Sequence, residues 1–246
     1  MNPIAIVQAR MGSTRLPGKV LLPLAGTTVL GCVVERLSRC DSLHGIVIAT
    51  SDLAQDEPVV EEAGRLGVPW ERGDANDVLA RYCDAARRSG ADPVVRITSD
   101  CPLIDPDVVD AVVRAYAAGE CDYASNTTER TYPRGLDTEV VSRGALERAR
   151  RDASESYERE HVTPHIYRHP ETFRIRAYRN PDGSDRSALR WTLDTSDDYA
   201  FVQAAYQACA HRVPSDVRTI DLLAAIARMP ELAAINASVP QKEPGR

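Results

Sequence analysis

The sequence lacks the glycine-rich signatures of two common nucleotide-binding loops. It contains no G-x-x-x-x-G-K-[ST] segment and no G-x-G-x-x-G segment. The first absence argues against a Walker-type ATPase and the second against a Rossmann dinucleotide enzyme, because each chemistry needs glycines at that spacing. An H-E-x-x-H helix motif is missing as well, so a zinc protease is not indicated.

Long apolar runs and an excess of positive charge are also missing. No apolar stretch approaches the roughly 18 to 20 residues of a membrane-spanning helix, and Met1-Asn2-Pro3 lacks the basic start of a signal peptide. The 246 residues carry 36 acidic and 30 basic side chains, giving a formal net charge of −6. We therefore expect no membrane role and no broad electrostatic capture of nucleic acid.

The cysteines show no pairing pattern. None of them has C-x-x-C spacing, and most lie in apolar stretches. We expect reduced, mainly buried thiols, as in a cytoplasmic protein. The six are Cys32, Cys40, Cys83, Cys101, Cys121 and Cys209.

The first half of the chain alternates apolar runs with amphipathic segments. Residues 4–7 are apolar without alternation, which is typical of an interior parallel strand. Asp105 is placed to cap a helix with Pro106 in its first turn. The alternation predicts a doubly wound α/β fold with a mostly parallel sheet and helices on both faces. The expected strands are 4–7, 45–50, 68–71 and 94–97, and the expected helices are 28–38, 56–66, 76–88 and 106–117.

The rhythm changes after residue 120, and we expect residues 120–180 to form an inserted arm for substrate binding or dimerisation. The arm belongs to a single domain, residues 1–246, in which residues 240–246 form a frayed polar tail. The later elements expected are a loop at 126–135, strands at 138–141, 172–178 and 188–193, and helices at 144–151, 157–168, 197–210 and 217–228.

The loop after the first strand, residues 9–19, gathers positive charge at an edge of the predicted sheet. Gly12 and Gly18 permit close backbone approach to an anion. Arginine and lysine side chains together suit a polyphosphate, although a basic surface loop is the alternative. The three cations are Arg10, Arg15 and Lys19.

Carboxylates follow two of the expected strands. Asp100 comes just after strand 94–97, and Asp194 ends strand 188–193. Mg²⁺ commonly binds carboxylates together with phosphate oxygens and water, so the pair suggests a magnesium site. Taken alone, Asp100 could instead be a turn or helix-cap residue. The acidic pair at 197–198 is instead expected to favour the start of a helix.

Three histidines fall at a spacing of four residues. His161, His165 and His169 would share one helical face, which suggests zinc. Pro164 lies within that segment and no cysteine accompanies it, so we favour polar contact with substrate or a neighbouring subunit, chiefly through Glu160 and His161.

Three segments in order resemble the acid-sugar cytidylyltransferases, which make CMP-sialic acid and CMP-Kdo. Residues 9–19 read A-R-M-G-S-T-R-L-P-G-K and resemble the family's A-R-x-x-S-x-R-L-P-x-K loop. Residues 100–103 are similar to its second motif, and residues 193–198 to its late D-T-x-[ED]-D segment. The resemblance extends to the SpsF-like spore-coat-polysaccharide branch through residues 72–73, 76–82, 132–137 and 160–164.

The resemblance implies a glycosyltransferase-A-like nucleotidyltransferase fold, CTP as nucleotide substrate, Mg²⁺ as cofactor and a homodimer. It assigns the phosphates to Arg10 and Lys19 and the metal to Asp100 and Asp194, and these four are the expected catalytic residues. The residues expected to bind the nucleotide are Gln8, Ala9, Arg10, Gly12, Ser13, Arg15, Lys19, Thr50, Ser51, Arg72, Asn76 and Asp77.

The implied reaction transfers CMP from CTP to a hydroxyl of a 2-keto-3-deoxy acid sugar and releases pyrophosphate. Residues 98–103 read T-S-D-C-P-L, where acid-sugar enzymes carry Q-G-D-E-P-L or Q-x-T-S-P-L. The alternatives are therefore another nucleotide, a non-sugar acceptor such as a phosphonate, a glycosyltransferase or a non-catalytic nucleotide-binding protein. The residues expected to face the acceptor are Arg134, Asp137, Glu160, His161 and Arg190.

Overall fold

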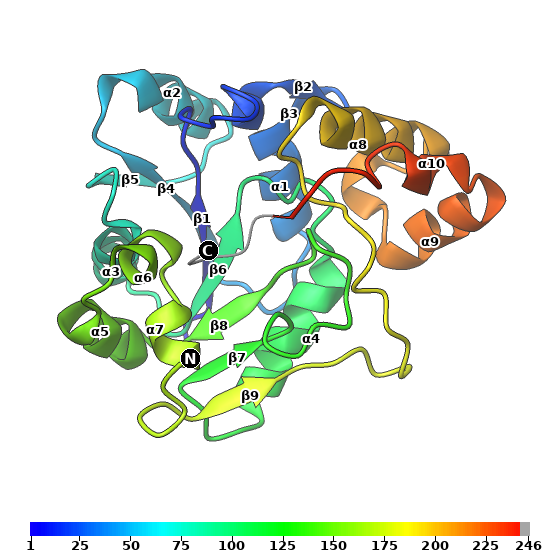
Figure 1. Cartoon of the computed structure of the whole chain (residues 1–246). Coiled ribbons are helices and arrows are strands. Elements are labelled where there is room, and N and C mark those ends of the chain that lie inside the picture. The colour runs from blue at the N-terminus through cyan, green and yellow to red at the C-terminus, as the bar shows by residue number, and fades with distance from the viewer. Residues whose placement is uncertain (242–246) are drawn as a thin grey trace.

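A mixed sheet of seven strands forms the centre of the computed structural model, which describes residues 1–241. Its strands are β1 (Ile4–Gln8), β4 (Gly45–Ser51), β5 (Trp70–Gly73), β6 (Val94–Thr98), β7 (Tyr123–Ser125), β8 (Glu139–Val141) and β9 (Ile175–Ala177). They lie in the order β5-β4-β1-β6-β8-β7-β9 (Figure 1). Only β8 runs antiparallel to its neighbours in this sheet. The predicted mostly parallel α/β sheet is confirmed.

Helices cover both faces of the sheet (Figure 1). Leu79, Tyr82 and Leu146 are buried on the α3 and α5 face, and Leu30 and Val112 on the α1 and α4 face. The helices are α1 (Val29–Leu37), α2 (Glu57–Arg65), α3 (Val78–Ser89), α4 (Pro106–Ala117), α5 (Arg143–Asp152), α6 (Ser156–His161), α7 (Pro164–Tyr167), α8 (Ser196–Ala208), α9 (Thr219–Arg228) and α10 (Glu231–Ala234). Short elements are the 3-10 helices η1 (Lys19–Leu21), η2 (Ala54–Asp56) and η3 (Pro214–Asp216), and the hairpin strands β2 (Pro23–Leu24) and β3 (Thr27–Thr28).

Strand β1 lies where the winding of the sheet reverses. It pairs in parallel with β4 on one side and with β6 on the other. The chain runs from β1 to β4 and β5, then crosses to β6. In open α/β sheets, ligands bind outside the carboxyl ends of the strands at such a switch point. The fold therefore directs attention to the loops that follow β1 and β6.

Residues 120–180 extend the sheet and cover one of its faces. Strands β8, β7 and β9 continue the sheet beyond β6 in that order, and α5, α6 and α7 form a group next to α3 (Figure 1). Phe173 and Ile166 share a hydrophobic cluster with Leu79 of α3. The use of this segment for substrate binding or dimerisation stays a prediction.

Two expected elements were wrong. The helix expected at 157–168 is divided into α6 and α7, because Val162 adopts φ 74° and Pro164 supplies no backbone N–H. The strand expected at 188–193 is absent as a strand among the described residues, and only an isolated bridge joins Arg134 to Arg190. The backbone of this segment instead donates to loops, as when Leu193 N–H contacts the Asp100 carbonyl at 2.8 Å.

The remaining differences are small. The strand expected at 172–178 is shortened to β9, and β7, α10 and the β2–β3 hairpin were not expected. Of the tail expected at 240–246, residues 242–246 lie outside the described residues. Within residues 1–241, no helix combines the length and apolar character needed to cross a membrane.

Candidate active site

A cavity of about 1100 Å³ lies at the carboxyl ends of β1 and β6. The loop after β1 forms one wall, and Thr98, Ser99 and Asp100 form the wall after β6. Asp194 reaches the same cavity from the segment before α8. The two carboxylates expected to converge therefore share one cavity with the cationic loop, although Asp194 follows a loop and not the expected strand.

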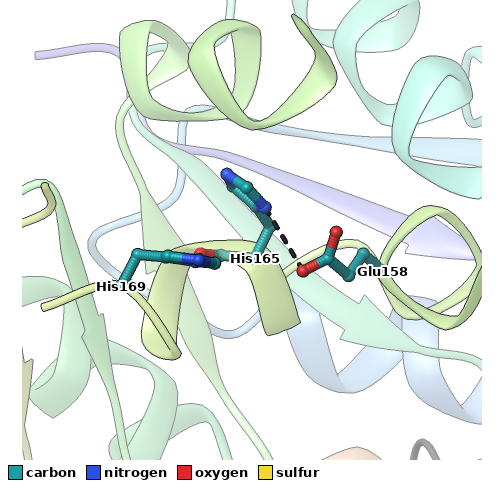
Figure 2. A group of neighbouring side chains, drawn as sticks. All are labelled: Glu158, His165 and His169. Atoms are coloured by element: carbon teal, nitrogen blue, oxygen red, sulfur yellow. Dashed lines mark hydrogen bonds and ion pairs between the residues drawn. The ribbon is translucent and has the colours of Figure 1, made fainter. Parts of the chain in front are cut away.

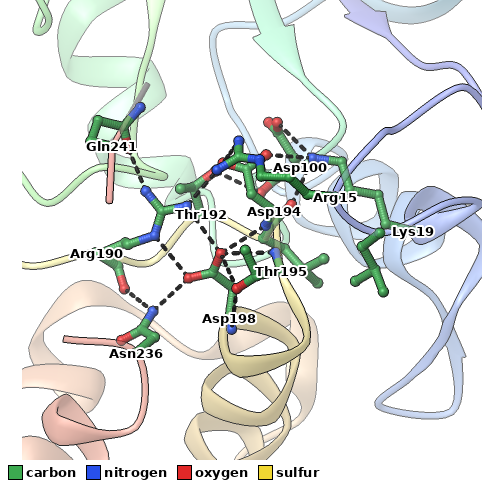
Figure 3. Close-up of polar contacts among 12 residues, drawn as sticks. Arg15, Lys19, Asp100, Arg190, Thr192, Asp194, Thr195, Asp198, Asn236 and Gln241 are labelled. Carbon is green, nitrogen blue, oxygen red and sulfur yellow. Dashed lines mark hydrogen bonds and ion pairs between the residues drawn. The ribbon is translucent and has the colours of Figure 1, made fainter. Parts of the chain in front are cut away.

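Lys19 occupies the centre of this charged group. Gly18, just before it, adopts φ 68°, a backbone region that favours glycine, and starts helix η1. The Lys19 Nζ donates to Asp194 Oδ1 and to the Leu193 carbonyl at 2.7 Å each, and to Asp100 Oδ2 at 3.2 Å (Figure 3). One ammonium thereby joins the loop after β1 to both carboxylates.

These contacts fix the protonation of the group. Burial on its own lowers the pKa of Lys19, but the charges of Asp100 and Asp194 outweigh it and raise that pKa above its ordinary value. Burial on its own raises the pKa of Asp100, but Lys19 and a hydrogen bond from Thr98 outweigh it and lower that pKa. Near neutral pH, Lys19 is therefore cationic and Asp100 is ionised.

A second set of contacts holds Asp194 in place. Its Oδ2 lies 2.9 Å from Arg15 Nη2 and accepts a hydrogen bond from Arg190 Nη2 at 2.9 Å (Figure 3). Arg190 also binds Asp198 through Nε at 2.8 Å, and Asn236 donates to Asp198 at 2.9 Å. The position of Asp194 is thus set by residues from the β1 loop, from α8 and from the C-terminal segment.

The oxygen atoms around Lys19 fit a divalent cation. Asp100 Oδ2, Asp194 Oδ1 and the Leu193 carbonyl oxygen each accept a hydrogen bond from the Lys19 ammonium, so the three oxygens surround one positive charge. Oxygen donors of this kind are those that Mg²⁺ prefers. The side chain of Asp100 is 27% exposed, so one of the two carboxylates is open to the cavity.

The loop after β1 is held in shape by its own backbone contacts. Met11 N–H donates to Asp56 Oδ1 at 2.6 Å, and Leu16 N–H donates to Ser13 Oγ at 3.3 Å. Arg10 lies 3.6 Å from Glu160 across the cavity. All seven nucleotide residues expected in this part of the chain line the cavity: Gln8, Ala9, Arg10, Gly12, Ser13, Arg15 and Lys19.

The other expected nucleotide residues are not part of the cavity lining. The Arg72 guanidinium donates to the carbonyls of Ser51 and Leu53 at 3.0 and 3.1 Å and pairs with Glu57 at 2.7 Å. Asp77 caps α3 and pairs with Arg159. The five expected nucleotide residues outside the lining are Thr50, Ser51, Arg72, Asn76 and Asp77.

Four of the five residues expected to face the acceptor line the cavity, namely Arg134, Asp137, Glu160 and His161. Asp137 is bound by both Nη atoms of Arg130, at 2.6 and 2.8 Å. Burial lowers the pKa of His161, so its imidazole is neutral near pH 7. The fifth, Arg190, is bound to Asp194 and Asp198 instead, beside a smaller cavity.

Sequence reasoning missed a buried ion pair in the cavity wall. Arg96 and Glu139 line the cavity and bind each other. Glu139 also accepts hydrogen bonds from Tyr123 at 2.5 Å and Thr163 at 2.6 Å. A signal was present, because Arg96 interrupts an otherwise apolar strand. Burying such a charge requires a nearby partner.

The histidines divide between two places. His161 lines the cavity, whereas His165 and His169 lie together with Glu158, their possible ligand atoms all within 4.8 Å of one another (Figure 2). His165 Nδ1 is 3.2 Å from Glu158 Oε1, and His169 Nδ1 is 2.7 Å from the His165 carbonyl. The single histidine face expected from the spacing is therefore wrong, since the helix breaks at Val162.

Comparison with known proteins identifies the family of this chain. The family model described as Cytidylyltransferase matches residues 4–217. An uncharacterised protein of Methanocaldococcus jannaschii, MJ1063, is 36% identical over 242 residues, which cover 98% of this chain and 97% of the relative.

Two further relatives cover the chain almost completely. The spore coat polysaccharide biosynthesis protein SpsF of Bacillus subtilis is 34% identical over 239 residues, covering 95% of this chain and 98% of SpsF. The solved structure of a cytidylyltransferase from Leptospira borgpetersenii aligns with a TM-score of 0.89 at 33% identity, covering 99% of this chain and 100% of that one.

Proposed function

The chain belongs to the cytidylyltransferase family, and from that membership we propose that it transfers the cytidylyl group of CTP to a hydroxyl of an acidic sugar. The observation that carries the proposal is the contact of Lys19 with both Asp100 and Asp194 at the switch point of the sheet. Pyrophosphate is the second product. The oxygen of the acceptor hydroxyl forms a bond to the α-phosphorus, and the bond from that phosphorus to the pyrophosphate oxygen breaks.

The residues of the cavity supply positioning and charge neutralisation, which account for most of the catalysis in phosphoryl-type transfer. Arg10, Arg15 and Lys19 line the cavity and are the cations that we assign to the triphosphate and the leaving pyrophosphate. Gly12 and Ser13 offer close backbone approach beside them. The acceptor hydroxyl loses a proton in this reaction. Asp100, an ionised carboxylate that lines the same cavity, is the group that we assign to accept it.

A divalent cation, which we propose to be Mg²⁺, would be held by Asp100 and Asp194. When bound, it neutralises phosphate charge and lowers the proton affinity of a nearby hydroxyl. The aspartate pair fits it because both carboxylates already converge on a positive charge, that of Lys19.

The acidic acceptor is supported by the charge of the cavity wall. Arg134 lines the cavity and is the side chain that we assign to the acceptor carboxylate. Arg96 and Arg130 lie in the same wall, and each is paired with a carboxylate, Glu139 and Asp137 respectively. The homodimer and the cytoplasmic location expected from the sequence stay predictions, and light scattering of the purified protein tests the first.

The proposed function is tested by pyrophosphate release. Each of the four ribonucleoside triphosphates is mixed with Mg²⁺ and a panel of 2-keto-3-deoxy acid sugars, with the corresponding neutral sugars as comparison. We expect acceptor-dependent release with CTP, reduced at least about hundredfold by Asp100→Ala or Asp194→Ala. Asp152→Ala, on an exposed carboxylate at the end of α5, is the matched control and retains activity. Failure of CTP to bind contradicts the proposal.

A further inference from the structure

Glu158, His165 and His169 form a group of possible metal ligands outside the large cavity. Glu158 belongs to α6 and His165 to α7, and His169 follows α7. One possible ligand atom from each side chain lies within 4.8 Å of the other two (Figure 2). None of the three belongs to the lining described for the cavity at the ends of β1 and β6. The group is therefore separate from Asp100 and Asp194.

The backbone holds the imidazole of His169 in a form that binds metals. His169 Nδ1 lies 2.7 Å from the carbonyl oxygen of His165. A carbonyl oxygen only accepts hydrogen bonds, so Nδ1 is the nitrogen that carries the hydrogen. In the neutral ring, Nε2 then keeps a free electron pair. A hydrogen bond from the other ring nitrogen to a carbonyl is the usual support of a metal-binding histidine. His169 is thus prepared to bind a metal through Nε2.

A buried carboxylate faces the second imidazole. The side chain of Glu158 is 5% exposed, and its Oε1 lies 3.2 Å from Nδ1 of His165, whose side chain is 13% exposed. Two ligands of a tetrahedral zinc ion, with bonds of about 2.0 to 2.1 Å, lie about 3.3 Å apart. The separation of Oε1 and Nδ1 therefore suits two ligands of one ion. A bound cation would also compensate the cost of burying the carboxylate.

The donor atoms of this group select a class of metal. Two imidazole nitrogens with one carboxylate oxygen suit Zn²⁺ and other first-row transition metals, whereas Mg²⁺ prefers oxygen ligands. Three protein ligands leave one position of a tetrahedral ion for water. His165 and His169 are both partly exposed, so water reaches this side of the group. The group thus differs in chemistry from the pair of Asp100 and Asp194, which offers oxygen alone.

We propose that Glu158, His165 and His169 bind a first-row divalent transition metal such as Zn²⁺, and that this ion ties α6 to α7. The proposal goes beyond the reaction proposed above and does not depend on it. The site differs from the one that the histidine spacing suggested, because Glu158 takes the place of His161. Helix α6 also carries Glu160 and His161, which line the large cavity. The ion would therefore restrain the element that holds these two cavity residues.

Zinc uptake by the full chain, prepared without an affinity tag, tests the proposal. The chain is freed of metal with a chelator and titrated with Zn²⁺ by calorimetry, in excess Mg²⁺ so that the aspartate pair is covered. The variants are Glu158→Gln, His165→Gln and His169→Gln, and glutamine at 158 can still form the capping box of α6. His211→Gln, on an exposed histidine, is the matched control. Melting temperatures without metal check that each variant is folded.

We expect the wild-type chain to bind one Zn²⁺, to give a visible Co²⁺ spectrum of the tetrahedral type, and to melt at a higher temperature with Zn²⁺. Removing a group that only orients a metal ligand costs about 10- to 100-fold in affinity, so loss of a ligand itself should cost at least about 100-fold. His211→Gln should bind Zn²⁺ as the wild type does.

Two results overturn the proposal. The first is Zn²⁺ uptake that is absent from the wild-type chain or retained by folded His165→Gln and His169→Gln. The second is uptake that is lost in Asp194→Ala, because the ion then belongs to the aspartate pair.

Discussion

Lys19 is the residue on which the charge balance of the site depends. Replacing it by methionine leaves Asp100 and Asp194 facing each other without their shared cation. We expect Lys19→Met to lower the kcat of CTP-dependent pyrophosphate release about 100- to 1000-fold, because the cation that we propose to stabilise the leaving pyrophosphate is lost. The pKa of Asp100 should also rise from its lowered value, since Lys19 is the main charge that lowers it.

Kinetics and a pH titration of the carboxyl groups by NMR measure these two effects. Arg65→Met is the control, because it removes an exposed cation that pairs with Glu62 on α2, outside the cavity lining. A Lys19→Met protein with wild-type kcat would show that this ammonium does not take part in the reaction.

Asp198 links the site to stability at acid pH. Burial on its own raises the pKa of Asp198, but hydrogen bonds from Arg190 and Asn236 outweigh it and lower that pKa below the ordinary 3.8. Because the folded pKa lies below the unfolded one, the stabilisation is complete above about pH 4 and is lost as pH falls through the folded value. We expect Asp198→Asn to be less stable than wild type at pH 7.

Urea denaturation from pH 7 to pH 2.5 measures the difference between the two proteins. That difference should shrink as the pH falls below 4, because protonation removes the charge that the variant lacks. If the difference in the free energy of unfolding stays constant over the whole pH range, the loss of stability arises from packing rather than from ionisation.

At the scale of single residues, the sequence predicted which charged residues reach the cavity better than it predicted which partners their side chains bind. Asp100 and Asp194 were expected to converge at one edge of the sheet, and they share the cavity although the strand expected before Asp194 is a loop. The environment of Arg72 could not be predicted. Its guanidinium donates to Glu57 and to two backbone carbonyls, and only the folded chain brings these acceptors together. Arg81 lay in a segment similar to the SpsF-like branch, but nothing in the pattern showed that its side chain would be buried.

At the scale of elements, the close packing of two loops places Asp194. Gly135 has φ 103°, and a Cβ there would lie 2.5 Å from the carbonyl carbon of Trp191 and 2.7 Å from Thr192 N. We expect Gly135→Ala to lower the free energy of unfolding by about 2 to 4 kcal/mol, because strained φ and steric overlap add. Activity should fall as well, since the displaced segment carries Asp194.

Thermal or urea unfolding measures the stability change. Gly64→Ala on α2 is the matched control, because no atom lies within 4 Å of its added Cβ and its φ is not positive. That substitution should be neutral or stabilise the protein by up to about 1 kcal/mol through helix propensity. Equal effects of the two substitutions would contradict the steric argument.

The same loop contact shows why one element could not be predicted. Residues 188–193 have the apolar pattern of a strand, but Trp191 N–H donates to the Arg134 carbonyl at 2.7 Å and Leu193 N–H to the Asp100 carbonyl at 2.8 Å. These partners are loop residues far away in the sequence. Periodicity reports which side chains are buried, not which backbone groups pair. The break in the expected helix 157–168, by contrast, could have been predicted from the sequence, because Pro164 lies within it and a proline disrupts a helix interior.

For the whole molecule, the parallel part of the sheet was predictable, and the antiparallel position of β8 beyond β6 was not. Long apolar strands alternating with helices require a parallel sheet covered on both faces. Strands β8 and β9 lie within the expected strands 138–141 and 172–178, but three residues each do not reveal the direction in which they pair, and β7 was not expected. The antiparallel pairing of β8 with β6 joins Val94 to Val141, a contact that depends on how the intervening helix α4 returns the chain.

Ligand binding should stabilise the whole chain, because the cavity is lined by residues from Gln8 to Asp194 and on to Gln241. A ligand at 100 times its dissociation constant stabilises the folded state by about 2.7 kcal/mol. For a domain of this size that corresponds to an increase of about 5 to 10 °C in the melting temperature. We expect this increase with CTP and Mg²⁺, and a smaller one with CTP and EDTA, because the phosphates then lack the cation that we propose the aspartate pair to hold. Differential scanning calorimetry measures both values. In Asp194→Ala the two increases should become similar, and an unchanged dependence on Mg²⁺ in that variant would place the cation elsewhere.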